Sequence, residues 1–247
     1  MLEICVASLA SARAACRGGA QRLELCAGLE VGGLTPDVEL LRQIREEMDI
    51  PVRCLMRPRG GDFLYTPEEL ELMARQIRNL AAAGAEGFVI GCLTPDGDLD
   101  KEAMAPLLEA ARGYGLTLHR CIDVSRDPIA TYKTAGELGI DTVLTSGAAS
   151  TAMGGLDTIE KLLEVRRTQG GPQILIASNV RASVIEAIQA RCPDADAFHT
   201  SAKTEIESAM VFRRHEVPMG LPGLDEWHIQ QTNEDVVREA AQALGIL

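Results

Sequence analysis

The sequence predicts a single-domain α/β fold, the TIM or (β/α)8 barrel, from three observations. Eight short apolar runs alternate with helical segments, and every run ends in polar residues. Successive runs lie on average about 28 residues apart, which suits a strand, a crossover helix and two short loops. Eight such units in 247 residues favour closure into a barrel over an open doubly wound sheet, which is the alternative.

The predicted strands are parallel, because a helical segment separates each apolar run from the next. Their carboxyl ends therefore lie at one end of the barrel, where the active sites of this fold are found. In chain order the strands are residues 2–5, 23–26, 52–56, 88–90, 116–118, 142–144, 174–176 and 197–198.

Several helix starts can be read between the runs. Thr66 offers an N-cap hydroxyl, Pro67 suits the first helical position, and Glu69 is placed to close a capping box. The apolar residues of 70–81 then follow three-and-four spacing until Gly84, which predicts an amphipathic helix. Further starts are predicted at Thr35-Pro36, at Asp127-Pro128 and, for the last helix, near Thr232.

One domain spanning residues 1–247 is expected, because the chain is 46% hydrophobic and no low-complexity linker divides it. Residues 204–231 are the irregular segment, rich in Pro and Gly, and they separate the eighth strand from the last helix. We expect an excursion of this length to cover the barrel mouth as a lid or to pack on another subunit. The alternative is an ordered surface loop whose Trp227 covers the barrel wall.

The composition argues against several functional classes. A net charge of −12 disfavours a nucleic-acid interface or an anionic membrane surface, since both need a basic face. The N-terminal segment lacks the basic and long apolar regions of a secretion signal, and no stretch could span a bilayer. Seven cysteines, an odd number without close pairs, indicate free thiols in a reducing cytoplasm.

A series of motifs runs in order from the first predicted strand to the eighth. They are LEIC at 2–5, RLELC at 22–26, GGLTP at 32–36, RPRGGDF at 57–63, HRCID at 119–123, VLTSG at 143–147 and HTSA at 199–202. Together these motifs resemble the copper homeostasis protein CutC family. The resemblance implies a cytoplasmic TIM barrel that forms a dimer or tetramer and is linked to copper handling. Residues 177–181 depart from the Gly-rich turn usual after strand seven, which weakens an analogy with phosphate sites.

Two carboxylates, Glu3 and Glu24, lie inside the apolar runs of the first two strands, where a buried charge needs a partner. Alternation places Glu3 with Cys5, and Glu24 with Cys26, on one face of each strand. If that face points into the barrel, these four side chains converge with basic groups from strands three and five. The alternative is that both carboxylates face the helix layer and pair with arginines there.

Cys5 and Cys26 are the predicted metal ligands. They lie on adjacent strands, roughly 5 Å apart, and Cu(I) prefers thiolate ligands. The predicted function is therefore Cu(I) binding in a polar pocket at the strand ends, with a metal ion or a small anion as the partner. The alternative is that these thiols are simply buried, as cysteines often are, beside carboxylates that raise a thiol pKa.

A second hypothesis is an enzyme acting by acid/base chemistry on a small anionic metabolite. Arg57 and Arg59 end the third strand, and their planar forks suit bidentate contact with a carboxylate or phosphate. Glu24 or His119 would move a proton, with Asp123 holding the imidazole. The other candidate binding residues near strand ends are Glu3, Asp62, Arg120, Ser146, Asn179, Ser201 and Lys203.

Arg57 and Asp62 have a purely structural alternative, a salt bridge that stiffens their loop. For His199, at the end of the eighth strand, the structural alternative is a core histidine whose hydrogen bonds are satisfied. A third class of function, a binding or scaffold protein without chemistry, would need an exposed apolar patch.

Overall fold

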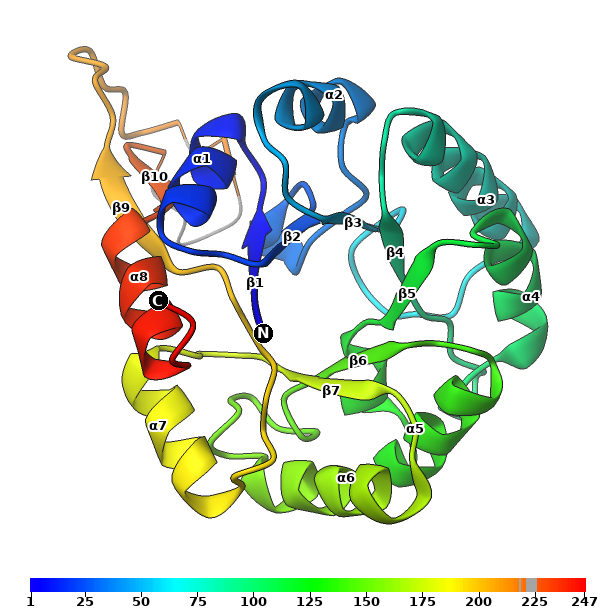
Figure 1. The fold of residues 1–247 in the computed structure, drawn as a ribbon. Coiled ribbons are helices and arrows are strands. Elements are labelled where there is room, and N and C mark those ends of the chain that lie inside the picture. The colour runs from blue at the N-terminus through cyan, green and yellow to red at the C-terminus, as the bar shows by residue number, and fades with distance from the viewer. Residues whose placement is uncertain (218, 221–225) are drawn as a thin grey trace.

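Eight parallel strands close into a barrel, which confirms the predicted fold class (Figure 1). The computed structural model describes residues 1–217, 219–220 and 226–247. The strands are β1 (Leu2–Val6), β2 (Arg22–Leu25), β3 (Val52–Leu55), β4 (Gly87–Ile90), β5 (Gly115–Leu118), β6 (Thr142–Thr145), β7 (Gln173–Ile176) and β8 (Phe198–Thr200). Because β1 pairs with both β2 and β8, the sheet closes on itself.

A ring of helices surrounds the strands (Figure 1). The helices are α1 (Leu9–Arg17), α2 (Val38–Glu47), α3 (Pro67–Ala82), α4 (Lys101–Ala110), α5 (Pro128–Glu137), α6 (Leu156–Gln169), α7 (Ala182–Arg191) and α8 (Glu234–Ala243). Within the described part of the chain, no helix has both the length and the apolar character that crossing a membrane requires.

The helix starts bear out most of the sequence predictions. Thr66 and Glu69 form the reciprocal capping box of α3, and Asp127 caps α5. The start predicted at Thr35 is wrong, since α2 is capped by Asp37, whose carboxylate accepts from two backbone N–H groups. The Thr35 hydroxyl instead accepts a hydrogen bond from the backbone N–H of Arg57, at 3.0 Å, and so ties two loops together.

The Arg53 side chain lies beside the starts of strands β4 and β5, where Gly87 and Gly115 leave room for it. Arg53 of β3 crosses to Thr117 of β5 at 2.6 Å and forms an ion pair with Asp141 at 2.8 Å. A Cβ added at Gly87 or at Gly115 would come within 2.8 Å or less of the Arg53 side chain. These two positions therefore need glycine, and the guanidinium fills the space that their missing side chains leave.

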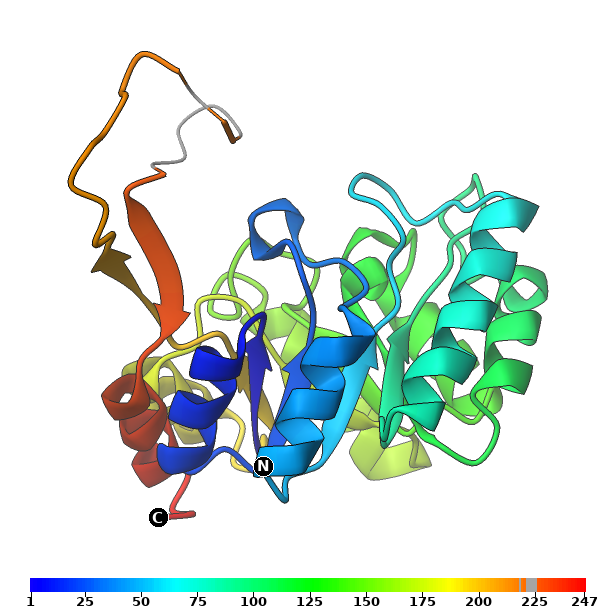
Figure 2. The ribbon, with the colours of Figure 1, turned by 90° about the horizontal axis from the view of Figure 1, so that it is seen from above.

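The predicted irregular excursion is ordered at both ends. Residues Lys203–Glu207 form β9 and His228–Thr232 form β10, and these two strands pair antiparallel. The hairpin rises at the carboxyl-terminal end of the barrel strands, away from both chain ends (Figure 2). It stands at the rim near α1 and α8 and not over the centre of the ring (Figure 1). The described part of the excursion is therefore not a closed lid.

Candidate functional site

Two adjacent cavities, which share part of their wall, lie at the carboxyl ends of the strands. The deep cavity, of about 180 Å³, lies inside the barrel, and the rim cavity, of about 370 Å³, lies by the loops after β7 and β8. They share the wall residues Cys5, Leu29, Arg120 and His199. Glu24, Cys26, Leu55, Arg57, Phe63, His119 and Leu144 complete most of the deep wall, and Asn179, Arg181, Ser201 and Lys203 belong to the rim.

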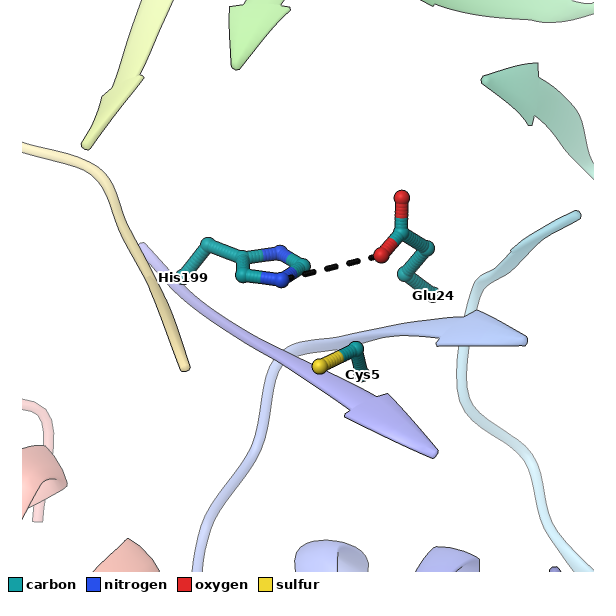
Figure 3. Close-up of side chains that lie close together, drawn as sticks. All are labelled: Cys5, Glu24 and His199. Carbon is teal, nitrogen blue, oxygen red and sulfur yellow. Dashed lines mark ion pairs between the residues drawn. The ribbon is translucent and has the colours of Figure 1, made fainter. Parts of the chain in front are cut away.

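A thiol, a carboxylate and an imidazole lie close together in the wall of the deep cavity (Figure 3). Cys5 of β1, Glu24 of β2 and His199 of β8 each offer a ligand atom, and these atoms lie within 4.8 Å of one another. His199 Nε2 lies 3.6 Å from a Glu24 carboxylate oxygen. All three side chains are buried, so this cluster, which we call the Cys5–Glu24–His199 cluster, is held by the barrel itself.

Glu3 anchors this cluster from below. Its carboxylate forms an ion pair with Arg22 and accepts a hydrogen bond from Nδ1 of His199 at 2.7 Å. Burial opposes ionisation of Glu3, but the hydrogen bond to His199 and the charge of Arg22 outweigh it and lower its pKa to about 2. For His199 burial is likewise outweighed, here by Cys5 and the two glutamates, which raise its pKa well above the usual value. The imidazole is therefore a cation whose close counter-charge is the Glu3 carboxylate.

Glu24 is in a less favourable position than Glu3. Burial raises the pKa of its carboxyl to about 7, and the charge of His199 offsets this only in part. Strand β2 thus carries Glu24, which is hard to ionise, and the neighbouring strand β1 carries Glu3, which is easy to ionise.

The predicted convergence of Glu3 and Glu24 inside the barrel agrees with the structure, and the alternative of pairing with helix arginines does not. The partners of Glu3 come from strands β2 and β8. Cys5 and Cys26 both line the deep cavity, but Cys26 is not in the ligand cluster. Its thiol lies 3.6 Å from the carbonyl of Val6, and burial raises its pKa.

His199 was not among the predicted site residues. For His199 the sequence left a core histidine as the structural alternative, although closure of the predicted barrel already places the eighth strand beside the first. The signal that could have found it is alternation on the last strand, which places His199 on the same face as Ala197 and Ser201. In the structure Glu3 and His199 are direct neighbours across the β1–β8 seam.

The two arginines of the predicted anion clamp point to different places. The Arg57 guanidinium donates to the carbonyls of Val31, Gly33 and Gly61 at 2.8–2.9 Å, so it joins two loops. Arg59 pairs with Glu69 at 2.7 Å and with Asp62 at 3.1 Å, outside both cavities. The two guanidiniums therefore do not face a common site in this structure, and Asp62 pairs with Arg59 and not with Arg57.

His119 lines the deep cavity with one ring nitrogen unpaired. Its Nδ1 accepts a hydrogen bond from the backbone N–H of Cys121 at 3.2 Å, and its buried Nε2 has no partner among the described residues. Burial and the nearby charge of Arg57 lower the pKa of His119 to about 3, so the ring is neutral. Gly91 makes room for it, since a Cβ there would lie 2.6 Å from the ring.

Asp123 does not hold the imidazole of His119. Its carboxylate accepts hydrogen bonds from Thr145, from Ser146 and from the backbone of Ala148, and it forms an ion pair with Arg120. The carboxylate turns toward this loop because the loop presents several donors at once. Asp123 and the buried Ser146 thus shape the loop after β6, whereas Asn179, Ser201 and Lys203 lie in the wall of the rim cavity.

Comparison with known proteins shows similarity along nearly the whole chain. The model of the CutC family matches residues 1–204. A CutC family protein from Porphyromonas gingivalis strain W83 is 42% identical over 98% of this chain and 97% of its own length. The human protein named copper homeostasis protein cutC homolog is 39% identical over 96% of this chain and 86% of its own length.

A solved structure agrees with the fold. The crystal structure of a CutC protein from Streptococcus agalactiae superposes with a TM-score of 0.76 at 26% identity, covering 81% of this chain and 98% of that one. The family model and the sequence relatives together span nearly all of the chain, and it belongs to the CutC family.

Proposed function

We propose that this protein binds Cu(I) at the mouth of the barrel and takes part in copper homeostasis. The observation that carries the proposal is the Cys5–Glu24–His199 cluster, whose ligand atoms lie within 4.8 Å of one another. The human relative is named a copper homeostasis protein homolog. Cys5 and His199 would be the principal ligands, with Glu24 beside them and Cys26 in the cavity wall.

The ligand atoms of Cys5, Glu24 and His199 suit a soft metal ion such as Cu(I) only in part. Thiolate and imidazole both suit copper, and Cu(I) favours thiolate above other ligands. A carboxylate is a poorer ligand for Cu(I), and the set of one Cys, one His and one Glu also suits Zn(II). Copper would take the place of the proton on Nε2 of His199, and the Glu3 carboxylate at Nδ1 would orient the ring in the way that a carboxylate orients a metal-bound histidine.

Removing the thiol of the cluster is expected to abolish high-affinity Cu(I) binding. Cys5→Ser should weaken the affinity by about 100-fold or more, because the remaining imidazole and carboxylate are weaker ligands for Cu(I). Cys26→Ser should weaken it less, since the Cys26 thiol is outside the cluster. The measurement is a competition titration against a Cu(I) chelator under reducing conditions, repeated with Zn(II).

Cys192→Ser is the matched control, because Cys192 is a free, buried thiol at the end of α7, away from both cavities. Unchanged Cu(I) affinity in Cys5→Ser would remove the cluster from the copper site. Tighter binding of Zn(II) than of Cu(I) under the same conditions would keep the metal site and overturn the copper assignment.

We also propose that the chain forms a single domain, that it is located in the cytoplasm, and that it assembles into a homo-oligomer. All seven cysteines are free, which suits a reducing compartment. The excursion exposes apolar side chains, among them Val211 at 98% and Phe212 at 67%, which a second subunit could cover.

A further inference from the structure

The rim cavity is basic in a protein that is acidic as a whole. Its wall contains Arg120, Arg181 and Lys203 and no Asp or Glu, whereas the chain carries a net charge of −12. Cu(I) has no need of guanidinium or ammonium groups beside it. The charge of this wall therefore calls for another explanation.

Two of these cations have no partner within the described residues. Most arginines of the chain are paired with a carboxylate, as Arg13 is with Glu47 and Arg191 is with Asp157. Arg120 is paired with Asp123 through Nε. Arg181 and Lys203, in contrast, make no ion pair or side-chain hydrogen bond with any residue that the structure describes. Both are exposed and line the same opening, so they are available to an anion.

The deep cavity contributes two buried donors that lack an acceptor. Nε2 of His119 and Nε of Arg57 have no hydrogen-bond partner among the described residues, and both side chains are more than nine-tenths buried. Nδ1 of His119 already accepts from the backbone, so in the neutral ring Nε2 carries the hydrogen. Leaving a buried donor unpaired costs free energy, and an oxygen atom in the cavity would recover it.

The backbone of the rim has an unusual conformation. Three residues without the freedom of glycine have positive φ in its wall, namely Ser178 at 80°, Asn179 at 56° and Ala202 at 45°. Such conformations are costly and collect at ligand sites. The turn after β7 therefore adopts a left-handed conformation at Ser178 and Asn179, although residues 177–181 contain no glycine.

We infer that the two adjacent cavities together bind a small organic anion that also carries a carbonyl group. Its phosphate or carboxylate would lie at the rim with Arg181 and Lys203, and its carbonyl oxygen would accept hydrogen bonds from His119 Nε2 and Arg57 Nε in the deep cavity. A carbonyl is the matching group, because it accepts two hydrogen bonds and has no proton of its own to place. This inference goes beyond copper binding and does not depend on it.

The test uses isothermal titration of the metal-free wild-type protein with four probes. Dihydroxyacetone phosphate carries both groups, glycerol 3-phosphate lacks the carbonyl, inorganic phosphate is the anion alone, and levulinate replaces phosphate with carboxylate. Dihydroxyacetone phosphate or levulinate should bind more tightly than the other two by about tenfold, and whichever is tighter identifies the anionic group. The affinity should fall as salt is added.

Variants separate the two ends of the ligand. Lys203→Gln and Arg181→Gln should each weaken both phosphate esters by about tenfold, because each removes a charge-assisted contact. His119→Phe keeps a ring beside Phe63 but removes the donor, so it should abolish only the preference for the carbonyl probes. Lys133→Gln is the matched control, since Lys133 is an exposed cation on α5, outside both cavities.

Three results would overturn the inference. They are no binding of any probe to the wild-type protein, an equal loss of affinity in Lys133→Gln and Lys203→Gln, and a preference for carbonyl probes that survives in His119→Phe.

Discussion

Glu3→Gln is expected to destabilise the protein by about 3 to 5 kcal/mol, the usual cost of breaking a buried ion pair. The Glu3 carboxylate is 1% exposed and faces three cations, Arg22, Arg53 and the His199 imidazolium. Glutamine keeps the shape but not the charge, so the buried Arg22 loses its ion-pair partner and His199 loses the carboxylate at Nδ1, whereas Arg53 keeps Asp141. Urea unfolding at pH 7, followed by circular dichroism, measures the change.

Glu24→Gln is the matched comparison, since it makes the same chemical change on the adjacent strand. It is expected to be near neutral or slightly stabilising. Burial raises the pKa of Glu24 to about 7, so the folded protein gains little from its charge, and Glu3 remains to balance His199. The response of the variant's melting temperature to Cu(I) should also be smaller than that of the wild type, because Glu24 belongs to the Cys5–Glu24–His199 cluster.

The pair of variants separates a structural carboxylate from a ligand-binding one. Equal destabilisation by both changes, with the response to Cu(I) intact in Glu24→Gln, would mean that the two charges only hold the barrel together. The metal site would then lie elsewhere.

The fold was predictable because its signal repeats. Each unit contributes an apolar run and a helix, and a start such as Thr66 with Glu69 follows from local hydrogen bonding alone. Thr35 shows the limit of local reasoning. Its hydroxyl could cap a helix, but the neighbouring loop offers the backbone N–H of Arg57, and Asp37 is left to cap α2.

The candidate site was predictable only in part, because closure and loop contacts decide it. Alternation placed Glu3 and Glu24 correctly, since a strand offers only two faces. Alternation on β8 together with barrel closure could also have placed His199 beside Glu3, but only the register fixes that pairing, and no local pattern shows that Asp123 turns to the loop after β6. The sequence also suggested Arg57 as an anion clamp, whereas backbone carbonyls take up most of its donors. Such carbonyls are present at every residue, so no side-chain pattern reveals them.

The stability of the wild-type protein is expected to fall with acid through His119. The pKa of this group is lowered from its usual 6.5 to about 3, so between these values the unfolded chain binds a proton that the folded protein refuses. The contribution of His119 is therefore fully present above pH 6.5 and is lost as the pH falls toward 3. The expected slope is up to about 1.4 kcal/mol per pH unit within this window.

The measurement compares wild type with His119→Phe by urea unfolding from pH 3 to pH 8. Glu24 contributes with the opposite sign, because its raised pKa makes the folded protein lose stability as the pH rises from 4.5 toward 7. That contribution is present in both proteins and cancels in their difference. The stability of wild type relative to that of His119→Phe should therefore fall steadily as the pH is lowered from 6.5 to 3. Parallel curves across this window would mean that the folded protein accepts the proton, and that Nε2 of His119 is not the neutral, unpaired donor on which the anion site depends.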